Sequence, residues 1–194
     1  MQMGLNLTNL RKTGFFKEYE SLSEKELLNA LHENRRKEYA KIFEYDYEPE
    51  KLRDDHELAV QDSKKFLDID LEADVRAENQ VYIYLLEDFA KASDGHFSPI
   101  GIEETWESDE GPIQVSFTSN GSDITFKPEY MDDWIDGKVF DVINAEMQKV
   151  TSERFYLCAG PNEEWFGQNV IYVRLTENEK KLLEEKLDWK FPQE

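Results

Sequence analysis

The chain has 194 residues and carries 43 Asp and Glu against 23 Lys and Arg, a formal net charge of −20. This surplus of anions opposes binding to DNA, RNA or an anionic membrane, because those ligands are held by Lys and Arg. The 12 Phe, 9 Tyr and 4 Trp residues exclude an acidic disordered tail, which would have few aromatics. We therefore expect a folded domain, and a basic macromolecule is the partner that long-range electrostatics favours.

Cysteine content and hydropathy indicate the compartment. The single cysteine, Cys158, excludes an internal disulfide and suits a reducing environment. Residues 1–14 lack the apolar core of a signal peptide, and the longest apolar run, 81–86, is far too short to span a bilayer. We expect a cytoplasmic protein that does not enter membranes.

Helical spacing dominates the first half of the chain. Ser23 and Glu26 form the sequence of a capping box, in which each side chain bonds a free backbone N–H at a helix start. Apolar residues then recur at helical spacing to about residue 43. A second, weaker helix is predicted from Glu48-Pro49 to about residue 65, because proline suits the first helical position.

A third helix is predicted from Asp74, as its N-cap, to Ser93, and Gly95 supplies the stop signal. Near this glycine the spacing of the apolar residues changes from the helical period to the two-residue alternation of a strand. We expect a single domain, with a helical N-terminal region over 1–95 and an antiparallel sheet with two helices over 96–194. This order of elements is typical of the α+β class.

A β-hairpin is predicted around Asn120-Gly121. This dipeptide favours a type I′ turn, which requires positive φ at both central residues. Counting outwards from a two-residue loop gives the predicted pairs Ser119 with Ser122, Phe117 with Ile124, and Val115 with Phe126. The apolar residues then share one face, which a slip by one residue would destroy.

The remaining predicted elements are strands over 100–107, 154–158 and 170–175, and a helix over 132–150. Thr176 and Glu179 form a second capping box, which opens a last helix to about Leu187. Trp189 and Phe191 follow that helix and are expected to dock on the core, because two exposed large aromatics would be unusual.

One acidic run suggests a calcium-binding loop but does not match the EF-hand pattern. The run alternates acidic and other residues: Asp68, Asp70, Glu72 and Asp74. An EF-hand loop needs Gly at its sixth position and Glu at its twelfth, where this chain has Ala73 and Asn79. We interpret the run as the solvated face of a strand. No two histidines have the spacing of a zinc-ligand pair, so no metal site is assigned.

Catalytic and cofactor motifs are also lacking. Cys158 ends a predicted buried strand, where a free cysteine behaves as a small hydrophobe. His96 follows the Gly95 stop, and its best functional role is as a general base beside a carboxylate. The sequence has no glycine-rich phosphate loop. We therefore assign no catalytic residue and no cofactor.

The informative feature is a charge asymmetry. Between Ile100 and Asp136 there are ten acidic residues and one base, a net charge of −9, with large aromatics interleaved. The loop over 160–167 repeats this combination. Carboxylates beside Tyr and Trp suit the capture of Lys and Arg from a partner. The predicted partner contacts are Glu103, Glu104, Trp106, Glu107, Asp109, Glu110, Glu129, Tyr130, Asp132, Asp133, Trp134, Asp136, Glu163, Glu164 and Trp165.

Small, acidic, cysteine-poor α+β chains without catalytic motifs are similar, as a class, to immunity proteins that neutralise basic bacterial toxins. This resemblance rests on composition and implies a non-enzymatic inhibitor, which covers the toxin's active site or mimics phosphate. Two alternatives remain open. One is an enzyme whose site gathers carboxylates with His56 or His96 only in the folded chain, and the other is a structural adaptor. The acidity itself has a plainer explanation, since net charge also keeps proteins soluble.

Overall fold

The structure is a computed structural model that describes residues 2–43, 49, 52, 54–165 and 167–192. Helices come first and antiparallel sheets with interspersed helices follow, which confirms the predicted α+β class. In chain order the elements are α1 (Gln2–Lys12), a 3-10 turn (Lys17–Tyr19), α2 (Glu24–Ile42), α3 (Asp55–Ala59), β1 (Phe66–Asp70), α4 (Val81–Ala92), β2 (Ile100–Trp106), β3 (Ile113–Ser119), β4 (Ser122–Phe126), α5 (Lys138–Met147), β5 (Arg154–Cys158), β6 (Asn169–Leu175) and α6 (Glu177–Leu187).

The described strands form two three-stranded antiparallel sheets, in the orders β1-β6-β5 and β2-β3-β4. β6 is the central strand of the first sheet, where Val173 lies opposite both Phe66 of β1 and Tyr156 of β5. β1 contains Asp68 and Asp70, the first two members of the acidic run that was interpreted as the solvated face of a strand. It belongs to the N-terminal half, so the helical region and the C-terminal region share one sheet.

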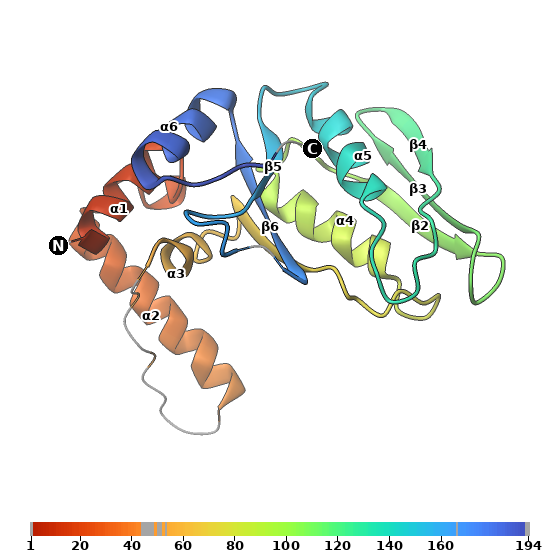
Figure 1. The fold of residues 1–194 in the computed structure, drawn as a ribbon, viewed down its shortest axis with the longest axis horizontal. Coiled ribbons are helices and arrows are strands. Elements are labelled where there is room, and N and C mark those ends of the chain that lie inside the picture. Colours follow the sequence, from red (N-terminus) through yellow and green to blue (C-terminus); the bar gives the residue numbers. More distant parts are fainter. Residues whose placement is uncertain (1, 44–48, 50–51, 53, 166, 193–194) are drawn as a thin grey trace.

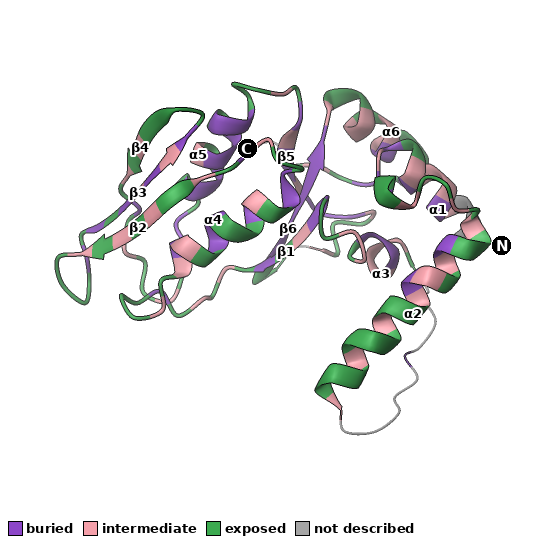
Figure 2. Ribbon diagram, turned by 180° about the vertical axis from the view of Figure 1, so that it is seen from behind, coloured by how far each residue is buried: buried purple, intermediate pink, exposed green. Residues whose placement is uncertain are grey.

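Each face of the first sheet carries its own core. Side chains alternate along β6, so Ile171, Val173 and Leu175 belong to the cluster with the N-terminal helices and α6, whereas Val170 and Tyr172 belong to the other. The second cluster includes residues of α4, α5 and the β2-β3-β4 sheet. Figure 1 shows these two groups on opposite sides of β5 and β6, and Figure 2 shows purple, buried segments concentrated between them.

The predicted hairpin is confirmed residue by residue. Asn120 and Gly121 have φ values of 51° and 75°, as a type I′ turn requires. The observed pairs are Ser119 with Ser122, Phe117 with Ile124, and Val115 with Phe126. The hairpin therefore presents Val115 and Phe117 to the core, where both are buried.

Both predicted capping boxes are also confirmed. Ser23 and Glu26 exchange side-chain and backbone hydrogen bonds at the start of α2, and Thr176 and Glu179 do so at the start of α6. Trp189 docks on the core as predicted, with its side chain fully buried.

The second predicted helix is wrong in extent. The described helix in this region is α3, five residues long, whose N-cap Asp54 accepts a hydrogen bond from the Glu57 N–H at 2.9 Å. The predicted start at Glu48 lies outside the described residues. Turns follow α3, and β1 begins at Phe66.

The third predicted helix begins later than expected. α4 starts at Val81 after Gln80, and Asp74 lies in the preceding loop instead of at the N-cap. The side-chain amide of Asn79 donates to the Asp74 carbonyl at 2.7 Å and holds that loop. The helix-start N–H of Tyr82 is bonded at 3.0 Å by the carboxylate of Glu104, from a distant strand.

The helix predicted over 132–150 is shorter, because α5 begins at Lys138. The residues before it pair with the chain that follows β1. The Ala73 N–H donates to the Asp133 carbonyl at 2.8 Å, and the Ile135 N–H donates to the Leu71 carbonyl at 2.9 Å. Just before them, residues 131–134 form a tight turn, in which the Trp134 N–H donates to the Met131 carbonyl at 3.2 Å and Asp132 has a φ of 58°. This turn and the pairing of 133–135 replace the predicted first turn of the helix.

Candidate functional site: an acidic and aromatic surface

The predicted contact residues divide between internal and exposed positions. Glu104 of β2 is half-buried, and both of its carboxylate oxygens are bonded within the chain. Its Oε2 accepts the Tyr82 N–H, and its Oε1 accepts the Trp106 indole N–H at 2.9 Å. Burial raises the pKa of the Glu104 carboxyl, although these hydrogen bonds oppose the shift. Both oxygens of Glu104 are thus engaged within the chain, and its role as a partner contact stays a prediction.

Asp136 is also internal. Its Oδ2 accepts the Glu129 N–H at 2.6 Å, and its Oδ1 accepts the Lys138 N–H at 3.0 Å. Desolvation alone would raise the pKa of the Asp136 carboxyl, but these bonds and the nearby Lys138 ammonium outweigh it, so the net pKa is lowered. Glu129 is exposed, yet it forms an ion pair with Lys138 at 2.9 Å.

Two of the predicted aromatic anchors are held by packing. Trp106 is half-buried against the core, with its ring 6.0 Å from that of Tyr130 in an edge-on arrangement. Tyr130 is itself half-buried. Neither ring projects freely, so both support the surface rather than form its outermost part.

Exposed acids surround these rings. Glu103 lies on the open side of β2, and Glu107, Asp109 and Glu110 lie in the loop that follows it. Partial desolvation, and then the charges of Asp132 and Glu110, raise the pKa of the Tyr130 hydroxyl. The Tyr130 hydroxyl donates to Oδ1 of Asp132 at 3.4 Å, which places Asp132 beside this ring.

The most exposed aromatic among the predicted contacts is Trp134, with 41% of its surface accessible. Met131, at 49%, lies three positions before it, at the start of the same turn. Trp134 pairs with Glu72 in an isolated β-bridge, which places Glu72 beside it. We call the group formed by Glu72, Met131, Asp132, Asp133 and Trp134 the Trp134 patch. Among the described residues, no Lys or Arg forms an ion pair with the carboxylates of this patch.

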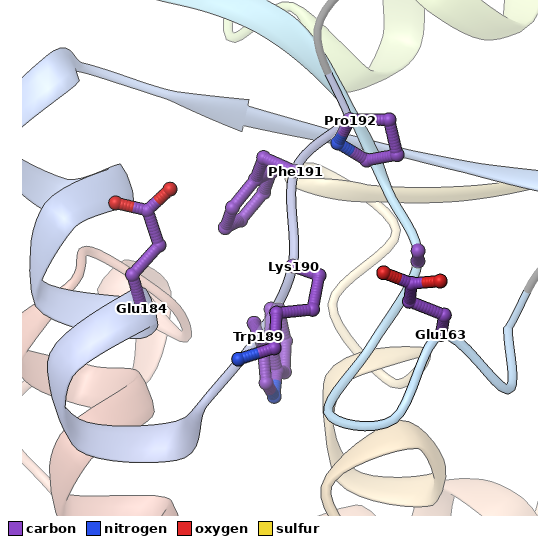
Figure 3. Close-up of a pocket in the computed structure, with 7 residues that line it drawn as sticks. Glu163, Glu184, Trp189, Lys190, Phe191 and Pro192 are labelled. Atoms are coloured by element: carbon purple, nitrogen blue, oxygen red, sulfur yellow. The ribbon is translucent and has the colours of Figure 1, made fainter.

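The loop after β5 forms a second acidic and aromatic region. Glu163 and Glu164 are exposed, whereas Trp165 is half-buried with its ring 4.8 Å from that of Trp189. A cavity of about 650 Å³ lies on the Glu163 side of this loop, and Figure 3 shows Glu163 and Glu184 on opposite sides of the segment that carries Phe191. Glu184 already pairs with Lys180 at 3.4 Å.

A cavity of about 420 Å³ lies on the other side of Trp165 and was not foreseen from the sequence. It brings His56 of α3 to Asp68 of β1, with Nε2 and Oδ2 4.0 Å apart. The described residues that line it include no Ser, Thr, Cys or Lys. The pair therefore lacks a nucleophile of the kind that histidine activates in covalent catalysis.

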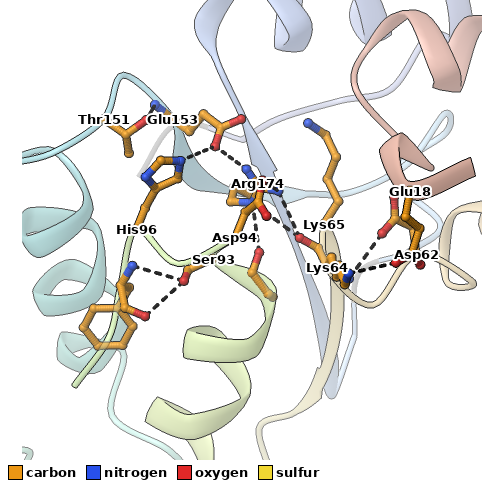
Figure 4. Close-up of polar contacts among 12 residues, drawn as sticks. Glu18, Asp62, Lys64, Lys65, Ser93, Asp94, His96, Thr151, Glu153 and Arg174 are labelled. Carbon is orange, nitrogen blue, oxygen red and sulfur yellow. Dashed lines mark hydrogen bonds and ion pairs between the residues drawn. The ribbon is translucent and has the colours of Figure 1, made fainter. Parts of the chain in front are cut away.

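His96 does lie beside a carboxylate, as a general base would, but that carboxylate is already engaged. Its Nε2 is 3.7 Å from Glu153, which forms a buried ion pair with Arg174 (Figure 4). The Arg174 Nε also donates to the Ala92 carbonyl at 2.9 Å, at the end of α4. The network joins β6 to α4 and has a structural role.

The remaining chemical candidates are placed in the core or on the surface. Cys158 is fully buried, and burial raises the pKa of its thiol to about 12, as expected for a packed cysteine. Asp68 and Asp70 are exposed on β1, as the solvated-strand interpretation requires. The described part of the chain contains no group of three or more His, Cys, Asp or Glu side chains arranged to hold a metal ion.

Comparisons with protein-family models, with curated proteins and with solved structures found no match to this chain. Within the described residues, no helix combines the length and the apolar character that crossing a membrane requires.

Proposed function

We propose that this chain is a non-enzymatic protein that binds a basic protein partner, and that the Trp134 patch is the centre of the contact. The observation that carries the proposal is the exposure of Trp134 and Met131 beside carboxylates that have no internal cation among the described residues. Tryptophan dominates binding energy at the centre of interfaces, and surrounding acids steer a basic partner towards it.

The finer form of the proposal is an immunity-type inhibitor of a basic toxin. The net charge of −20 supports it, because strong charge accelerates capture of an oppositely charged protein. The composition-based resemblance to immunity proteins supports it as well. Inhibition would follow from covering the toxin's cationic active site, without chemistry by the inhibitor. We also propose a cytoplasmic location, since a single cysteine suits a reducing compartment.

The test starts with affinity capture from the native host, followed by kinetics with the purified partner. We expect a partner of high isoelectric point whose association rate falls at least about tenfold between low and high salt. Trp134→Ala should raise the dissociation rate about 30-fold, the typical effect of losing an interface hot spot. The double change Asp132→Asn/Asp133→Asn should instead slow association.

The matched control removes two exposed charges elsewhere, through Glu87→Gln on α4 and Glu185→Gln on α6. Its net charge equals that of the patch double variant, so a difference between them reports position rather than total charge. Equal association rates for the two double variants, or wild-type affinity in Trp134→Ala, would overturn the proposal.

A further inference from the structure

The 420 Å³ cavity beside Trp165 lies at the end of the first sheet, on the face that the N-terminal helices and α6 cover. Three parts of the chain build it. α3 and its N-cap contribute His56 and Asp54, the strands contribute Asp68 and Ile171, and the loop after β5 contributes Trp165 with its neighbours. Cavities of this size are in the range of pockets that bind small molecules or single side chains.

One wall of this cavity is aromatic and held in place. The Trp165 ring meets the His56 ring edge-on, with the centroids 5.1 Å apart, and packs against Trp189 from behind. Gly160 lies directly under the Trp165 ring, so closely that a Cβ at this position would overlap it. The His56 ring also packs edge-on against the Phe66 ring, with the centroids 5.6 Å apart. A rigid aromatic wall of this kind suits stacking by a flat cation.

The opposite side of the cavity is negatively charged. Asp54, Asp68 and Glu164 line it, and none of the described lining residues is Lys or Arg. Asn169 donates to Oδ1 of Asp68 at 2.9 Å, which fixes this carboxylate and leaves Oδ2 towards His56. Asp54 uses Oδ1 to cap α3. Asp54 therefore keeps its second oxygen for a ligand, and Oδ2 of Asp68 can be shared between a ligand and His56.

The 650 Å³ cavity, on the Glu163 side of the same loop, has a less negative lining. Lys190 is among its lining residues, and Glu184 pairs with Lys180. Its negative charge is partly compensated within the chain, so a cation has less to gain there. The Trp165 cavity is the stronger acceptor of an external cation.

We propose that the Trp165 cavity binds the guanidinium group of an arginine from the partner. Guanidinium is planar, stacks on aromatic rings and bonds two carboxylates at once, whereas a lysine ammonium is a point charge. This inference rests on the proposed function, since it assigns the arginine to the basic partner. Asp68 and Glu72 of the Trp134 patch are four positions apart in the chain, so at most about 13 Å of backbone separates them, a distance that one partner surface can cover.

The test uses capped tripeptides with a central arginine or its neutral isostere citrulline. The indole N–H signal of Trp165, assigned in ¹H–¹⁵N spectra through Trp165→Phe, reports binding to the full chain. We expect the arginine peptide to shift this signal with a Kd near 1 mM, which is about −4 kcal/mol. The citrulline peptide should leave the signal unchanged.

The adjacent glutamates of the loop provide matched variants. Glu164→Gln and Asp68→Asn should weaken arginine-peptide binding about tenfold, whereas Glu163→Gln, on the side of the other cavity, should not. Unchanged thermal midpoints will show that each variant is folded. Equal shifts with both peptides, or equal losses in Glu163→Gln and Glu164→Gln, would overturn the inference.

The two proposals can fail separately. If patch variants weaken partner binding and the arginine peptide does not bind beside Trp165, then the cavity inference alone is wrong. If the peptide binds as expected and the captured partner is not basic, then the proposed function is wrong and the cavity remains an arginine site.

Discussion

Replacing Asp136 by Asn should destabilise the protein, although this residue belongs to the acidic stretch predicted to meet a partner. Each bond from a backbone N–H to a buried carboxylate contributes about 1.5–3 kcal/mol. Asn keeps one carbonyl acceptor and turns its NH₂ group towards the N–H of either Glu129 or Lys138. The variant thus loses one bond, and we expect the free energy of unfolding to fall by about 2–3 kcal/mol.

Urea unfolding followed by circular dichroism measures this loss. With a slope of about 2 kcal/mol per molar urea, the midpoint should fall by about 1–1.5 M. Asp132→Asn is the matched control, because Asp132 is exposed and its change should stay within about 0.5 kcal/mol. Equal midpoints for the two variants would refute the structural role of Asp136.

The stability difference between wild type and Asp136→Asn should depend on pH in a direction that the pKa of Asp136 determines. The folded-state pKa of Asp136 is lowered, so its stabilising contribution is present above the unfolded pKa of about 3.9. It is lost as the pH falls through the lower folded value. The difference in stability between wild type and Asp136→Asn should therefore be constant near neutral pH and shrink below about pH 4.

Two further predictions concern the core. Gly160→Ala should cost about 2–4 kcal/mol and alter the near-ultraviolet circular dichroism of Trp165, because φ is +72° and a Cβ would overlap that ring. Gly121→Ala has a similar φ of +75° with open space around it, so about 1 kcal/mol is expected, and equal losses in the two variants would contradict the packing. Cys158, with its thiol pKa raised to about 12 by burial, should resist Ellman's reagent at pH 8 until urea unfolds the chain, and rapid reaction of the native protein would count against that burial.

Features determined by neighbouring residues could be predicted from the sequence. The two capping boxes and the hairpin depend on contacts within a few positions, so Ser23, Thr176 and Asn120 sufficed to locate them. The start of α4 could not be located in this way. Its N-terminal N–H is bonded by Glu104, which lies 22 positions further along the chain.

The residues of the candidate site could be predicted from the sequence, but which of their side chains point outwards could not. Asp132 and Asp136 are the same residue type four positions apart, yet one is exposed and the other accepts hydrogen bonds from two backbone N–H groups. The difference comes from the pairing of 133–135 with 71–73, a long-range contact without a local signal. The approach of His56 to Asp68 also depends on the fold, because the turns between α3 and β1 bring the two elements together.

The central place of β6 affects how the protein is made. β1 ends at Asp70, and its partner strand begins at Asn169, roughly 100 residues later. At a synthesis rate of about 5–20 residues per second, β1 waits roughly 5–20 s on the ribosome before it can pair. During that interval the apolar side chains of Phe66 and Ile69 lack their neighbours in the sheet. A nascent chain that stalls before Leu175 therefore exposes apolar surface to chaperones and proteases.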